Sequence, residues 1–240
     1  MKKQLVPVIC IASLGLSSTG FAANSFDELR QLAQDDFRTL SEDLGAATSY
    51  KATSPGEPLG LLGFDVGVEI TATKLDKSVF EDATGDDWDY GYLPLPKLHV
   101  HKGLPFNIDV GGFYSGAPDT DIKLWGGEIR YSILEGTFIS PALSLRLTYS
   151  KLEGVDELEL SNQGVELSIS KGFAMITPYA GIGSIETESD AVKEPNLDKE
   201  KFTSTKLFAG FNLNLGVNFG VEVDKTGDVG SLSVKTGFRF

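Results

Sequence analysis

The chain has 240 residues and carries 34 acidic against 21 basic side chains, which gives a formal net charge of −13. So acidic a chain does not bind nucleic acid by neutralising its phosphates, and that class of function is excluded. The length suits one β-barrel or sandwich, or two small domains.

Residues 1–22 have the pattern of an export signal. Two lysines precede an apolar run over residues 5–16, and residues 20–22 form a small-residue cleavage site. The one cysteine, Cys10, lies inside this segment, so the processed chain has no thiol for a disulfide, a thiolate metal site or catalysis. No later apolar stretch approaches the ~20 residues that a membrane helix needs. Any membrane-spanning part must therefore be a closed barrel.

Residues 25–44 are predicted to form an amphipathic helix. Ser25 and Glu28 have the spacing of a capping box, and Gly45 follows as a stop signal. Apolar residues recur at spacings of three and four and form one stripe: Phe26, Leu29, Ala33, Phe37, Leu40 and Leu44. Residues 46–62 contain two prolines and two glycines and are interpreted as a linker.

From residue 63 onward the helical period gives way to alternation of apolar and polar side chains, the weak signal of a membrane barrel. Ten such strands are predicted, at about 63–73, 93–102, 106–114, 122–134, 141–151, 158–171, 175–186, 202–213, 216–224 and 231–240. An even number of strands brings both ends of the barrel to the same side of the membrane, which for this class is the periplasm.

The connections between these strands alternate in length, which a soluble sandwich has no reason to do. The short ones lie near Gly103, Gly136, Gly172 and Gly216 and are assigned to the periplasm. The long or acidic ones are assigned to the outside: 74–91, 116–121, 152–157, 187–200 and 225–229.

Aromatic residues predicted to face outward fall near the two ends of the strands, where the membrane interfaces would lie. The outer group is Tyr114, Trp125 and Tyr149, and the periplasmic group is Tyr131, Tyr179, Phe238 and Phe240. The opposite face of the strands carries nearly balanced charges, which must be paired or solvated. The lumen-facing candidates are Asp65, Glu69, Lys97, His99, His101, Asp109, Glu128, Arg130, Arg146, Glu166, Lys206, Glu222, Lys235 and Arg239.

The signal segment, ten alternating strands, paired aromatic belts and terminal Phe240 together resemble the outer-membrane β-barrels of Gram-negative bacteria. The resemblance covers residues 63–240 and implies an all-β, antiparallel transmembrane barrel of about ten strands, preceded by the helix and linker of residues 23–62. It further implies contact with outer-membrane lipids and lipopolysaccharide, and insertion by the barrel assembly machinery through the C-terminal strand. We expect the helix to occlude the periplasmic mouth or the lumen.

No cofactor, metal site or catalytic residue is predicted. His99 and His101 point the same way on one strand, but a metal needs a further ligand, and a structural role is the simpler interpretation. We expect a non-enzymatic barrel that acts as a narrow channel for small solutes or has a structural and binding role. Two alternatives stay open: a membrane-embedded enzyme that uses these histidines, and a secreted soluble barrel that carries an apolar ligand.

Overall fold

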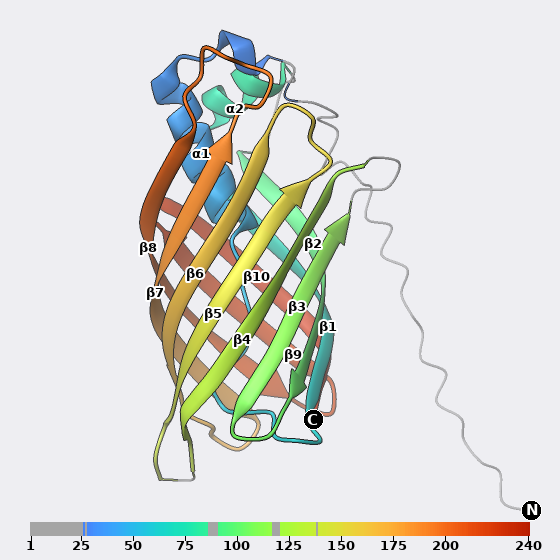
Figure 1. The fold of residues 1–240 in the computed structure, drawn as a ribbon. Coiled ribbons are helices and arrows are strands. Elements are labelled where there is room, and N and C mark those ends of the chain that lie inside the picture. The colour runs from blue at the N-terminus through green and yellow to red at the C-terminus, as the bar shows by residue number, and fades with distance from the viewer. Residues whose placement is uncertain (1–25, 27, 86–90, 117–120, 138) are drawn as a thin grey trace, which may run out of the picture.

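The computed structural model describes residues 26, 28–85, 91–116, 121–137 and 139–240. Over these residues the chain forms a closed antiparallel barrel in which strands adjacent in sequence pair and β1 pairs with β10 (Figure 1). The elements are η1 Leu29–Gln31, α1 Gln34–Thr48, β1 Phe64–Lys74, α2 Lys77–Thr84, β2 Tyr92–Gly103, β3 Ile108–Gly116, β4 Lys123–Glu135, β5 Ala142–Glu153, β6 Glu159–Ser170, β7 Ile176–Asp190, β8 Glu200–Asn214, β9 Asn218–Thr226 and β10 Val229–Arg239.

The ten-stranded fold predicted from the alternation is confirmed. Two long connections differ in detail from the prediction. Strands β7 and β8 extend to Asp190 and from Glu200, so the connection between them is shorter than predicted. The β1–β2 connection contains α2, because Asp76 caps its N-terminus by accepting hydrogen bonds from the backbone N–H groups of Ser78 and Val79.

The C-terminal strand closes the barrel against β1. Phe64 and Phe240 exchange backbone hydrogen bonds of 3.2 and 2.9 Å, and their rings lie 5.0 Å apart on the outside of the seam. The register continues upward, with Val66 opposite Phe238 and Ile70 opposite Val234. Closure satisfies the backbone groups of both terminal strands, which is the condition for a β-structure in hydrocarbon.

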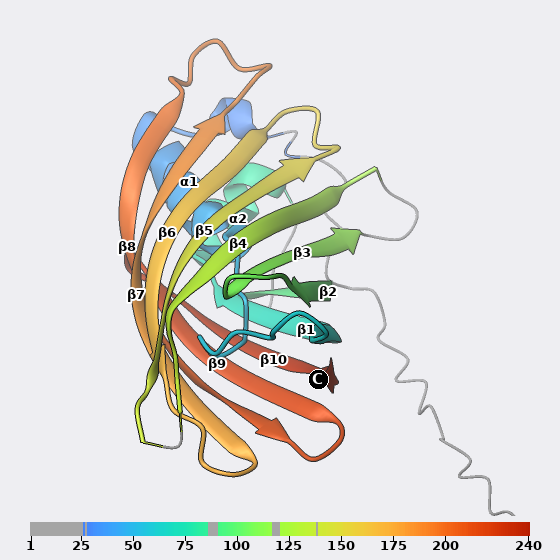
Figure 2. The ribbon, with the colours of Figure 1, turned by 60° about the horizontal axis from the view of Figure 1, so that its bottom comes forward.

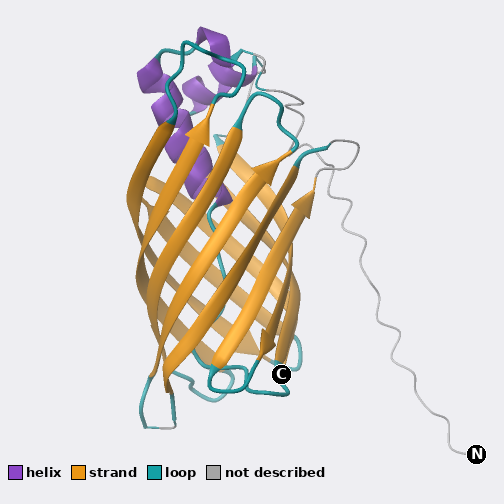
Figure 3. Cartoon of the chain, viewed as in Figure 1, coloured by secondary structure: helices purple, strands orange, loops and turns teal. Residues whose placement is uncertain are grey.

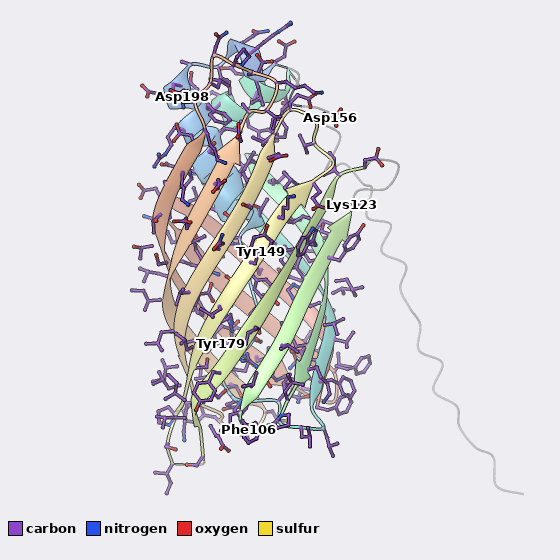
Figure 4. The ribbon with its side chains drawn as sticks, viewed as in Figure 1. Phe106, Lys123, Tyr149, Asp156, Tyr179 and Asp198 are labelled. Carbon is purple, nitrogen blue, oxygen red and sulfur yellow. The ribbon has the colours of Figure 1, made fainter. Side chains whose placement is uncertain are left out.

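The outer surface has an apolar belt below a charged collar. On β5 the outward residues Leu145, Leu147 and Tyr149 are exposed, and the next outward residue is Lys151. The belt continues onto the short turns, where Phe106 is exposed; Figure 4 shows Phe106 at that end and Tyr149 higher on the wall. Above the belt, outward residues of β7 form ion pairs with lysines at and just before the start of β8, as in Lys201–Glu186 at 3.0 Å and Lys199–Glu188.

The N-terminal helix differs from the prediction in its bounds. It begins at Gln34, because Leu32 and Ala33 are extended and separate it from η1, and it ends at Thr48. Gly45 lies inside the helix and does not stop it. A Cβ at this position would lie 2.8 Å from the side chain of Thr187, so the glycine allows the helix to approach the barrel wall closely.

The helix does not lie at the mouth formed by the short turns, which was the first of its two expected positions, but residues 43–48 of the helix are buried inside the barrel, which agrees with the second. It contacts α2 in the long β1–β2 connection and enters the barrel at the mouth formed by the long connections, not at the mouth formed by the short turns (Figures 1 and 2). The predicted linker then runs through the interior to the other end (Figure 3). This direction follows from the inner wall, whose apolar patch lies at the long-connection end and matches the apolar stripe of the helix.

In the described part of the chain, no helix is both long and apolar enough to cross a bilayer. The predicted export signal over residues 1–22, the capping residue Ser25 and residues 86–90 of the acidic loop lie outside the described residues.

Because Leu147 faces lipid in the middle of the apolar belt, Leu147→Arg is expected to lower the free energy of unfolding by about 2–4 kcal/mol. Thr203→Arg is the matched control, because Thr203 faces outward above the belt opposite Glu186, where we expect a cost of about 0–1 kcal/mol. Urea unfolding in lipid vesicles measures both. Equal costs at the two positions would mean that the belt has been placed wrongly.

Candidate functional site

The candidate site is the filled interior of the barrel, and its upper part is an apolar contact between α1 and one side of the wall. Phe37, Leu40 and Leu44 of the helix are buried among leucines from neighbouring strands. The wall residues of this cluster include Leu93, Leu95, Phe113, Leu124, Leu152 and Leu160. Burial of large apolar side chains contributes about 1.5–3 kcal/mol each, so this contact holds the helix in the mouth.

The opposite side of the upper wall is polar and built from small side chains. Its inward-facing hydroxyl groups belong to Thr71, Thr73, Thr187, Ser189, Ser231 and Ser233. The helix presents small residues to it: the Ser41 hydroxyl donates to Ser189 Oγ at 2.9 Å, and Asn162 on β6 donates to Thr48 Oγ1 at 2.9 Å. The inner wall is therefore apolar on one side and polar on the other, and the amphipathic helix has the same division of polarity.

Below the helix, Tyr50 and Lys51 anchor the chain at the centre of the lumen. The Lys51 ammonium group is fully buried, lies 3.2 Å from Asp224 Oδ1 and donates to the backbone oxygen of Ala46 at 2.9 Å. The Tyr50 hydroxyl lies 3.0 Å from His101 Nε2, and its backbone oxygen accepts a hydrogen bond from Lys206 at 2.8 Å. Both residues thus join the N-terminal segment to ionisable groups of the wall.

Residues 53–59 continue downward and are held mainly through backbone groups. Arg130 donates to Ser54 Oγ at 3.1 Å and to the oxygen of Pro55 at 2.8 Å. Asp109 accepts the N–H of Leu59 at 3.1 Å. Thr53 donates its hydroxyl to Glu69 Oε2 at 2.6 Å. The lower lumen is therefore filled by a chain whose backbone polar groups are satisfied by charged side chains.

The wall pairs most of its own charges around this segment. At the bottom, Asp65 binds Lys235 at 2.9 Å and Arg239 at 3.1 Å. On the other side, Glu166 joins Arg146 at 2.8 Å to Lys206 at 2.7 Å. Such pairs offset the cost of burying charge when each group has partners.

Among the described strand residues, acidic side chains with no more than 12% exposure exceed basic ones by one; Glu200, 14% exposed, lies at the mouth and pairs with Arg38 of α1. The acids are Asp65, Glu69, Asp109, Glu128, Glu166, Glu222 and Asp224, and the bases are Lys97, Arg130, Arg146, Lys206, Lys235 and Arg239. Lys51 of the N-terminal segment supplies one more positive charge, and it does so beside Asp224. The segment therefore completes the charge balance of the wall.

The structure places the predicted lumen-facing residues in this interior, in contact with one another or with residues 50–59. Lys97 lies 3.2 Å from Glu69, and Glu128 lies 2.9 Å from Arg146. His99 stacks on Phe113 and lies 3.2 Å from Glu69. Across the described residues, no group of three or more histidine, cysteine and carboxylate side chains has the arrangement of a metal site.

The aromatic and helix predictions need two corrections. Tyr179 does not face the membrane: it is buried and donates its hydroxyl to Glu222 at 2.9 Å, because the alternation of β7 is opposite to the one assigned from that residue. Ala33 is exposed, because it precedes α1 and does not belong to its stripe. Tyr114, Trp125, Tyr131 and Tyr149 lie on the outer face, as do Phe238 and Phe240.

Lys51, Tyr50 and Asp224 were missed by sequence reasoning. A signal for Asp224 was present, since it continues the inward alternation of Glu222 on β9. Residues 46–62 carried a weaker signal: their many small residues are typical of a linker but also fit a narrow lumen. Gly56, for example, lies so close to the wall that a Cβ there would meet Ser144 Oγ at 2.7 Å.

A cavity of about 770 Å³ opens beside α1 at the long-connection mouth and is lined by Asp43, Asp76, Lys77, Tyr92 and Asp228 among others. Asp43 is nearly buried there and accepts the backbone N–H of Asp76. Desolvation raises the pKa of the Asp43 carboxyl to about 6, against the opposing effect of this hydrogen bond.

A closed antiparallel barrel with an apolar outer belt and a polar, ion-paired interior defines a transmembrane β-barrel of the outer-membrane type. No family model matches the chain. A threonine–tRNA ligase of Oleidesulfovibrio alaskensis is 29% identical over 103 residues, and the match spans 40% of this chain but only 15% of the length of that enzyme.

Similar solved structures are bacterial barrels. The N-terminal β-barrel domain of Pseudomonas aeruginosa OprF has a TM-score of 0.37 and 15% identity, covering 72% of this chain and 97% of that one. The β-domain of the Bordetella autotransporter BrkA has a TM-score of 0.40 and 10% identity, covering 74% and 99%. The KdgM porin has a TM-score of 0.35 and 10% identity, covering 73% and 99%.

Lys51→Met is expected to lower the free energy of unfolding by about 3–5 kcal/mol, because it leaves Asp224 buried without its cation. Adding Asp224→Asn removes the unpaired charge and should recover most of the loss. Urea unfolding of the wild type, both single variants and the double variant forms the double-mutant cycle. Additive effects in the cycle would show that the pair does not couple the segment to the wall.

Asp43 is expected to make stability depend on pH. Between about pH 4 and 6 the unfolded carboxyl ionises while the folded one keeps its proton, so the free energy of unfolding falls as the pH rises through this window. Asp43→Asn should remove that part of the fall, while Asp35→Asn on the exposed first turn controls for the lost charge. The urea concentrations at the midpoint of unfolding, measured from pH 4 to 7, report this pH dependence. If the midpoints of the wild type and Asp43→Asn change with pH in parallel, Asp43 is not the group responsible.

Proposed function

We propose that this chain is an integral, non-enzymatic barrel of a bacterial outer membrane whose N-terminal segment closes the lumen to solutes. The observation that supports closure is the set of contacts from residues 50–59 to inward-facing charges, in particular Lys51 with Asp224 and Arg130 with Pro55. Displacement of the segment would remove the polar partners of these wall groups, so water would have to solvate them. The filled lumen would then become a hydrated one. The barrel then acts as a gated channel and not as an open one.

The outer surface of the barrel supports the proposed location in an outer membrane. An apolar belt followed by a charged collar suits a barrel that stands in lipid with one end in water. The partners that this proposal requires are outer-membrane lipids, lipopolysaccharide at the long-connection end, and the assembly machinery that receives the C-terminal strand. Phe240 lies at the seam with β1, where the C-terminal strand closes the barrel.

The proposal assigns the two histidines a structural role. His101 positions Tyr50 of the N-terminal segment, and His99 packs between Phe113 and Glu69. Both side chains are buried under the segment, so a substrate has no route to them while the lumen is filled. This geometry favours closure over catalysis.

Planar-bilayer conductance tests the closure. The refolded wild-type protein should be silent, and a variant lacking residues 26–56 should form stable channels. Heat-modifiable migration in detergent confirms that each protein is folded. Stable conductance of the intact protein, or silence of a folded deletion variant, would contradict the proposal.

A variant with the full chain guards against misfolding of the deletion. Gly45→Leu places a side chain against Thr187, so it should push α1 out of the mouth and raise the frequency of channel openings. Asp35→Leu, on the exposed first turn of the same helix, is the matched control and should leave the protein silent.

A further inference from the structure

The N-terminal segment enters the barrel from the mouth that carries the long connections. Gln34 in the first turn of α1 exchanges hydrogen bonds with the backbone of Asp198, which lies in the β7–β8 connection, at 3.1 and 2.8 Å. Arg38, one turn later, pairs with Glu200 at 2.9 Å and lies over the ring of Phe202 at 4.2 Å. Figure 4 shows Asp198 and Asp156 at this end of the molecule.

The same segment leaves at the opposite mouth, where β1 begins. Gly56 donates its N–H to Ser170 Oγ at the lower end of β6, and Arg239 at the end of β10 donates to the backbone oxygen of Glu57. The chain then turns at Gly60, whose oxygen accepts the N–H of Gly63, and enters the wall at Phe64. Residues 49–58 therefore traverse the interior from one mouth to the other.

The two mouths face different sides of the membrane. Barrels of this class have short turns in the periplasm and longer connections outside. The exposed apolar side chains at the short turns and the charged collar at the other end agree with that orientation. The helix α1 then lies on the cell-surface side, although the strand that follows it starts in the periplasm.

We infer that the barrel carries its own N-terminal segment across the membrane, so that the exposed start of α1 lies at the cell surface after crossing inside the lumen. The inference rests on the proposed outer-membrane location. An exported chain arrives from the periplasmic side, and the lipid offers no route for the polar residues 34–48. The interior does offer one: small hydroxyl side chains line one side of the upper wall, and the helix opposes them with Ser41, Gly45 and Thr48.

This passage gives the barrel a further function, the export of a peptide segment. The contacts also show what ends the export. The apolar stripe of α1 meets the leucine patch only at the upper mouth, and Lys51 meets Asp224 only when residues 53–59 fill the lower lumen. The segment is therefore held at the stage where the start of its helix is exposed at the upper mouth, while the rest of the helix and the linker still fill the lumen.

Single cysteines test the inference in the full-length chain, because the chain has no cysteine other than Cys10 of the predicted signal. Asp35→Cys marks the exposed start of α1, Asp156→Cys marks the β5–β6 connection at the same mouth, and Ile139→Cys marks the β4–β5 connection at the opposite mouth. Intact bacteria are treated with a membrane-impermeant maleimide, and parallel samples are treated after the outer membrane is permeabilised.

We expect Cys substitutions at Asp35 and Asp156 to be labelled to a similar extent on intact cells, and the one at Ile139 to be labelled only after permeabilisation. Labelling at Asp156 but not at Asp35 on intact cells would overturn the inference. Labelling at Ile139 alone would also overturn it, because it would mean that the barrel has the reverse orientation in the membrane. Neither result bears on closure of the lumen, which the conductance of the purified protein decides separately.

Discussion

The structure depends on one constraint: the charges that the strands turn inward must find partners in a confined space. Alternation along a strand sends every second side chain to the interior, and in this chain many of those side chains carry ionisable groups. Pairs such as Lys235 with Asp65 and Lys206 with Glu166 satisfy part of the set within the wall. Others are satisfied by the N-terminal segment, through the Lys51 ammonium group and the backbone of residues 53–59.

The upper interior obeys a second constraint, which is the shape of an amphipathic helix. A helix with one apolar stripe needs a wall that is apolar on one side only, and the inner wall provides it with leucines on one side and hydroxyl groups on the other. Close approach on the polar side depends on Gly45, which contacts Thr187. Helix and wall are therefore complementary in polarity and in shape, and the proposed closure follows from that fit.

The course of the segment links closure to transport. A plug inserted from the periplasm would need only to enter the nearer mouth, whereas this one occupies the far mouth with its helix and the lower lumen with its linker. Contacts at both ends, Gln34 with Asp198 above and Gly56 with Ser170 below, hold it in this extended position. The interactions proposed to close the lumen are thus the same ones that would retain the segment at the end of the proposed passage.

The sequence by itself determined the barrel, because alternation along a strand is a local property that pairing cannot change. Ten strands, the closing role of the last one and the inward direction of Lys97, Arg130 and Glu166 can all be read from neighbouring residues. Tyr179 was assigned to the wrong face because β7 carries glycines at 181 and 183, so its alternation is poorly marked.

The placement of the N-terminal segment was decided only by the tertiary structure. Its local sequence predicts a helix and a linker, yet which mouth receives the helix depends on an apolar patch that the consecutive strands β2–β6 assemble, at residues well separated in sequence from the helix. In the same way, Lys51 has no partner within its own segment that could neutralise it, and Asp224 lies 173 residues away. Contacts of this kind arise only when the barrel has closed, because closure is what brings such distant residues to the same depth in the lumen.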